Sequence, residues 1–123
     1  MSDAAKADAT PGLKLATPVP GEPPINQIFR TVMMHEASDL HLKAGLPGMM
    51  RLRGVIQKMN TKNLTQEDCE KLIYPVLSEK QRKLLDESGG ADFAYIIGAD
   101  ECRFRVNLFK QRGKLAMVAR RVN

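Results

Sequence analysis

The stretch C-R-F-R-V-N-L-F-K-Q-R-G-K-L-A-M-V-A-R-R, residues 102–121, decides the fold. Apolar and polar residues alternate up to Phe109, residues 110–113 have turn composition, and the chain then runs back, which predicts a β-hairpin. Pairing Phe109 with Lys114 sets a register in which the apolar residues share one face. These residues are Phe104, Val106, Leu108, Leu115, Met117 and Ala119.

Basic side chains gather on the other face of this predicted hairpin. The register places Arg103 opposite Arg120, with Arg105 on the diagonal. Like charges that face each other across two strands destabilise a sheet, and the guanidinium fork matches phosphate oxygens. The cluster therefore predicts an anionic partner, either a nucleotide phosphate or an acidic protein surface. Nucleic acid is disfavoured because only Phe109 offers a ring for stacking on bases.

Composition sets the class of the protein. The chain has 123 residues, 43% of them hydrophobic, and a net charge of +5, which suits one domain with a buried core and an anionic partner. Cys69 and Cys102 lack metal-ligand spacing to either histidine, so we expect two reduced thiols and no metal site. No apolar run reaches the length of a signal peptide or a membrane span, so a soluble cytoplasmic protein is expected.

The first 24 residues differ from the rest in composition. They are rich in Ala, Pro, Gly and Thr, so residues 1–24 are predicted to be a disordered tail and residues 25–123 the folded domain. An apolar stripe that follows Pro24 predicts a first helix up to residues 35–37.

Capping residues predict two further helices. Thr65 with Asp68, and Ser78 with Gln81, match capping boxes, while Pro75 is expected to end or kink the first of these helices. Alternating segments predict strands over 38–43, 49–53, 55–59 and 91–97, before the hairpin. This order predicts an α+β domain, in which helices cover one face of an antiparallel sheet of about six strands.

No stretch of the sequence matches a catalytic motif. Gly113-Lys114 lacks the upstream glycine of a phosphate-binding loop, and no nucleophile elbow is present. Asp39 and His41 share one strand face, either as a base with its orienting partner or as a polar surface or interface pair. Arg51 and Arg53 are either a solvated strand face or a ligand or interface pair. We therefore predict no catalytic residue.

Three blocks of the chain resemble the N-terminal domain of the type IV pilus retraction ATPases, the PilT-like family. They are A-S-D-L-H-L-K-A-G (37–45), L-x-x-E-D-x-x-x-L-I-Y-x-x-L-S-E-x-Q (64–81) and R-F-R-V-N-x-F-x-Q-R-G (103–113). The resemblance runs from about Ile25 to Val122. Glu36 departs from the family's usual glycine, and Arg53-Gly54 replaces the usual acidic-Gly turn.

The resemblance implies a PAS-like domain joined by a linker to a RecA-like ATPase domain, in a hexameric motor for pilus retraction and twitching motility. ATP and Mg²⁺ would bind that ATPase domain, and this chain would hold no cofactor. Arg105 and Arg120, then Arg103 and Arg112, would approach the nucleotide phosphates.

The resemblance also implies the partners of the domain. They are the ATPase domains of its own and neighbouring subunits, and the pilus machinery at the inner membrane, without membrane insertion. Asp39, His41, Arg51 and Arg53 are the candidate subunit-interface residues. The alternative is a free-standing basic α+β module that binds an acidic protein or nucleic acid.

Overall fold

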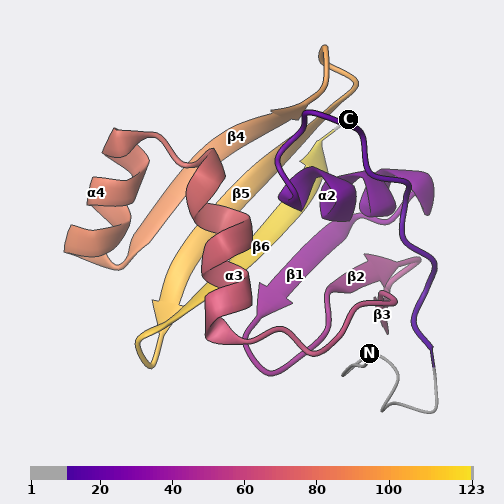
Figure 1. The fold of residues 1–123 in the computed structure, drawn as a ribbon, viewed down its shortest axis with the longest axis horizontal. Helices are drawn as coiled ribbons and strands as arrows, with labels where there is room; N and C mark the ends of the chain where they lie inside the picture. The colour runs from indigo at the N-terminus through magenta and orange to yellow at the C-terminus, as the bar shows by residue number, and fades with distance from the viewer. Residues whose placement is uncertain (1–10, 123) are drawn as a thin grey trace.

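The computed structural model describes residues 11–122 and consists of one antiparallel sheet with helices on one face (Figure 1). The helices are α2 (Ile25–Met34), α3 (Gln66–Ile73), the 3-10 turn η1 (Tyr74–Val76) and α4 (Glu79–Ser88). The strands are β1 (Asp39–Lys43), β2 (Met49–Leu52), β3 (Val55–Lys58), β4 (Gly90–Ile97), β5 (Cys102–Gln111) and β6 (Lys114–Val122). The predicted fold class and order of elements are confirmed.

The sheet has the order β3-β2-β1-β6-β5-β4, so β6 lies at its centre, between β1 and β5. Each neighbouring pair is antiparallel. All six apolar residues assigned to one face of the hairpin are buried under the helices. Among residues 11–122, no helix lies on the opposite face of the sheet, which we call the open face (Figure 1).

The register of the β5–β6 hairpin differs from the predicted one by two residues. Gln111 pairs with Lys114, so the connection is a two-residue turn of Arg112 and Gly113. Both residues have positive φ, 54° and 78°, as the type I′ turn requires, and this turn matches the twist of the flanking strands better than a four-residue loop does. A shift of two residues keeps every side chain on its predicted face, but it places Arg105, and not Arg103, opposite Arg120.

The β2–β3 hairpin turns in the same way. Arg53 and Gly54 have φ of 50° and 80°, and Leu52 pairs with Val55 on either side of them. The predicted strand over residues 49–53 is therefore wrong by one residue, because Arg53 belongs to the turn and does not share a strand face with Arg51.

The helix boundaries follow their predicted capping residues. Asp68 N donates to Thr65 Oγ1 while Thr65 N donates to Asp68 Oδ2, and Ser78 and Gln81 repeat this exchange. Each of these bonds satisfies a backbone amide at the start of a helix. The helix α3 gives way to η1 at Pro75, as predicted.

Aromatic packing joins α2 to the sheet. The ring of Phe29 lies 4.6 Å from that of Phe104 and 5.0 Å from that of Tyr95, measured between centroids. The Tyr95 hydroxyl donates to Asn26 Oδ1 at 2.6 Å, which satisfies two polar groups near the core. Burial raises the pKa of Tyr95, so the hydroxyl stays a donor at neutral pH.

Residues 11–24, part of the predicted disordered tail, instead lie along the domain as an extended segment, which we call the strap (Figure 1). Leu13 bridges to Met59 beside β3, and the amide of Ala16 donates to the hydroxyl of Thr31, which is fully buried in α2. Backbone bonds of this kind leave no pattern in composition, and for this reason the prediction of a disordered tail is wrong here. Residues 1–10 of the predicted tail lie outside the described residues.

An ion-pair network fastens the other end of the strap. Arg30 of α2 donates to Glu22 of the strap at 2.7 Å and to Glu101, between β4 and β5, at 3.1 Å. Hydrogen bonds from Arg30 lower the pKa of both carboxyl groups.

No helix within residues 11–122 is long and apolar enough to cross a membrane.

We predict that Gly12→Ala releases the start of the strap. A Cβ on Gly12 would lie 2.1 Å from the backbone of Met59, so the substitution should cost about 1–3 kcal/mol of unfolding free energy, as overpacking does. Thermal unfolding measures the loss, and hydrogen exchange should accelerate at the amide of Asn60, which donates to Leu13. Thr17→Ala, at an exposed strap position, is the control; equal effects of both variants would contradict the prediction.

We also predict that Arg30→Gln makes stability less sensitive to acid. Glu22 and Glu101 have folded pKa values below the ordinary 4.5, so their contribution is present above about pH 4.5 and is lost as pH falls through the folded values. The urea midpoint of the wild type should therefore approach that of Arg30→Gln between pH 7 and pH 3. Lys71→Gln, which removes an exposed pair with Glu67, is the control, and a gap independent of pH for Arg30→Gln would refute the idea.

Candidate functional site

A row of charged side chains crosses the open face, one from each of four neighbouring strands. In register order the row is Arg105, Arg120, Asp39 and Arg51, which lie on β5, β6, β1 and β2. Neighbouring strands are about 4.8 Å apart, so the row spans about 14 Å. We call it the arginine row; it brings together residues that are far apart in the chain.

The arginine row holds one carboxylate for three guanidinium groups. Asp39 lies 3.7 Å from Arg51 and 4.0 Å from the ring of His41. Within residues 11–122, neither Arg105 nor Arg120 has an ion pair or a side-chain hydrogen bond. Two arginines that make no ion pair within the described part of the chain therefore face each other across β5 and β6, an arrangement that an anion would stabilise.

Arg103 and Arg112 do not join this pair. Arg103 makes two hydrogen bonds to the carboxylate of Asp100, at 2.9 and 3.2 Å, and these bonds raise the pKa of Arg103 and lower that of Asp100. Arg112 sits in the turn at the other end of the hairpin, about 23 Å along β5 from Arg105 at the usual rise per residue. Of the four predicted phosphate-facing residues, the structure thus brings only Arg105 and Arg120 together.

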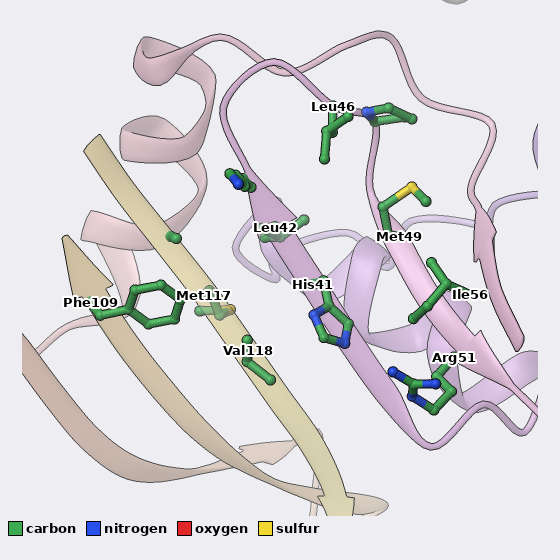
Figure 2. A pocket seen from close by; sticks show the side chains of 12 residues that line it. His41, Leu42, Leu46, Met49, Arg51, Ile56, Phe109, Met117 and Val118 are labelled. Carbon is green, nitrogen blue, oxygen red and sulfur yellow. The ribbon is translucent and has the colours of Figure 1, made fainter. Parts of the chain in front are cut away.

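Beside the arginine row lies an apolar hollow of about 290 Å³. Its lining includes His41, Leu46, Met49, Ile56, Phe109 and Val118. Figure 2 shows Phe109 and Val118 on one side of His41, with Met49 and Ile56 on the other. Leu46 and Ile56 are 45% and 39% exposed, so apolar surface faces solvent at the mouth of the hollow.

His41 has an unsatisfied nitrogen in this hollow. Its Nε2 is buried, and the structure gives it no hydrogen-bond partner among the described residues. An unpaired buried polar atom costs about 1–3 kcal/mol of folding free energy. A bound group that forms a hydrogen bond with Nε2 would remove this cost and so stabilise the complex. Asp39 and His41 lie on one strand face as predicted, but at 4.0 Å they are not hydrogen-bonded.

Two features of the site were not predicted from the sequence: the apolar hollow and the inward-pointing Arg121. The hollow was missed, although Phe109 and Val118 are apolar residues on the polar face of the hairpin and were the available signal. Arg121, next to Arg120, points to the helix side, where its guanidinium donates to the backbone carbonyls of Ala37 and Glu36.

Within residues 11–122, no group of three or more His, Cys, Asp or Glu side chains is arranged to hold a metal ion.

Comparisons with known proteins agree on one group of relatives, although no family model matches the chain. The type IV pilus retraction ATPase PilT of Pseudomonas aeruginosa is 40% identical over 86 residues, 70% of this chain. The type IV pilus ATPase PilU of the same organism is 31% identical over 96 residues, 78% of this chain. The chain covers only 25% of each of these relatives.

Solved structures give the same result. A crystal structure of the pilus retraction motor PilT with ADP matches 80% of this chain and 29% of its own, with a TM-score of 0.74 and 40% identity. The ATPase DotB of Legionella pneumophila matches 90% of this chain and 32% of its own, with a TM-score of 0.71 and 17% identity, and shares the fold. By sequence and by fold, the chain is homologous to the N-terminal region of the type IV pilus retraction ATPase PilT.

Proposed function

We propose that the chain is the N-terminal domain of a pilus-retraction motor ATPase and that it acts in assembly and regulation. The homology to PilT supports this role, and because the chain spans about a quarter of PilT, we place ATP, Mg²⁺ and phosphoryl transfer on a separate ATPase domain. The proposed motor is a homohexamer in the cytoplasm that works with the pilus machinery at the inner membrane.

The open face is proposed as the surface that packs on the ATPase domain of a neighbouring subunit. The apolar hollow and the unpaired Nε2 of His41 support this, because a packed partner would cover the one and satisfy the other. Arg51 lines the hollow, with Asp39 3.7 Å from it, and these polar residues would fix the orientation of the partner. Arg53, in the β2–β3 turn, would lie at the rim of this interface.

The pair Arg105 and Arg120 is proposed to face the phosphates of ATP bound on that neighbouring domain. The observation that carries this proposal is the direct opposition of two arginines, neither of which makes an ion pair within residues 11–122. A preorganised guanidinium pair stabilises the charge that develops on a transferring phosphoryl group. Arg103 would contribute only if the ligand displaced Asp100 from it.

The alternative is a free-standing basic module for an acidic protein or nucleic acid. Nucleic-acid binding would depend steeply on salt and would use aromatic rings for stacking. In the apolar hollow of the open face, Phe109 supplies such a ring. A single phenyl ring offers little stacking surface for bases, so an acidic protein is the better alternative partner.

We predict that Arg105→Gln stabilises the isolated chain by about 0.5 kcal/mol at low salt, because it removes the repulsion from Arg120. Chemical denaturation measures the gain, which should shrink as salt screens the two charges. The matched control is Arg103→Gln, which breaks the pair with Asp100 and should give no gain. If the two variants behave alike, the Arg105–Arg120 pair is not under strain.

We predict that Arg105→Ala and Arg120→Ala each lower ATP turnover at least about tenfold in a motor, since one removed electrostatic donor commonly costs more than that. The assay uses a chimera in which this chain replaces the matched N-terminal region of P. aeruginosa PilT. The control is Arg82→Ala, on α4 and remote from the open face. Unchanged turnover in both arginine variants would refute the proposed role, as would a chimera that assembles without hydrolysing ATP.

A further inference from the structure

A second hollow, of about 400 Å³, lies at the end of the sheet where β5 turns into β6. Its lining includes Lys43, Ala44, Gln111, Arg112, Lys114 and Ala116. The three cations come from two places in the chain, the end of β1 and the β5–β6 turn (Figure 1). We call it the basic hollow.

The cations of the basic hollow have no counter-charge. No acidic side chain lines it, and within residues 11–122 Lys43, Arg112 and Lys114 make no ion pair or side-chain hydrogen bond. All three are exposed. Three positive charges around one concavity raise the local concentration of anions, and the small side chain of Ala116, 3% exposed, also lines it.

Arg112 occupies a position that is unfavourable for its residue type. Its φ of 54° lies in the left-handed region, which costs an ordinary L-residue about 1–2 kcal/mol and which Asn or Gly fills at the first position of this turn. Arg53 occupies the same position of the β2–β3 turn with a φ of 50°, so what sets Arg112 apart is its place beside Lys43 and Lys114. The turn aims the Arg112 position at the same hollow as Lys43 and Lys114.

We propose that the basic hollow is a binding site for a small phosphate-bearing anion, separate from the arginine row. Arg112 supplies a fork for two phosphate oxygens, the two lysines supply point charges, and the Gln111 amide supplies a neutral hydrogen bond. The anion is a free di- or triphosphate or the phosphate of a lipid headgroup; the chemistry recognised is the same. The proposal does not rest on the function proposed above.

The test compares two double variants with the same net charge. Lys43→Gln/Lys114→Gln removes both lysines of the basic hollow and leaves Arg112, and Arg105→Gln/Arg120→Gln removes the opposed pair of the arginine row and leaves Arg51; each variant removes two positive charges. Pyrophosphate is titrated into the 123-residue chain at low salt, and amide shifts of Gln111 and Lys114 are followed by NMR. Removal of charge-assisted hydrogen bonds should weaken binding about tenfold or more in the first variant, with little change in the second.

A third variant, Arg112→Asn, removes the guanidinium while keeping a residue that tolerates positive φ, so the turn is retained. It should also weaken binding about tenfold. Sedimentation with phosphatidylglycerol vesicles, against phosphatidylcholine vesicles, identifies a headgroup as the source if it depends on the same three residues. Equal losses in both double variants would mean diffuse charge attraction and overturn the proposal, as would binding to neither pyrophosphate nor vesicles.

Discussion

The two-residue turn of Arg112 and Gly113 is the constraint on which the open face depends. It fixes the pairing of β5 with β6, and β6 in turn pairs with β1, so one turn places residues of three strands. A four-residue loop would leave the core intact, because a shift of two residues preserves the faces. It would, however, move Arg105 out of register with Arg120, so Arg105 would no longer be part of the arginine row.

This distinction explains what could be predicted from the sequence. Alternation and capping boxes report local requirements, so the order of the elements, the buried face and the caps at Thr65 and Ser78 were predicted correctly. The exact register was not, because Lys110 and Gln111 suit a strand end and a turn equally well. The strap was missed because its contacts leave no periodic signal: they are backbone hydrogen bonds of Leu13, the bond to the buried hydroxyl of Thr31, and the ion pair of Glu22 with Arg30.

In the candidate site, too, features with a local sequence pattern were predicted and features that depend on tertiary arrangement were not. The resemblance to the pilus retraction ATPases singles out Arg105 and Arg120 from the sequence, whereas their direct opposition follows from the register of the hairpin. The apolar hollow required the loop that contains Leu46 to approach β6, which is a tertiary arrangement with no local signature. Charge is distributed unequally on this face: the arginine row lies near one end of β6 and the basic hollow near the other.

Adjacent residues of β6 serve opposite sides of the sheet, and this has a mechanical consequence. Arg120 faces outward, while the neighbouring Arg121 holds the carbonyl of Ala37 at 2.8 Å, just after α2. β6 is paired with β1 from Ala116 to Arg120 on one side and with β5 along its whole length on the other. A pull on the carboxyl end of β6 along its axis therefore loads two ladders in shear, and through Arg121 it also pulls on the chain just after α2. This geometry resists unzipping strand by strand.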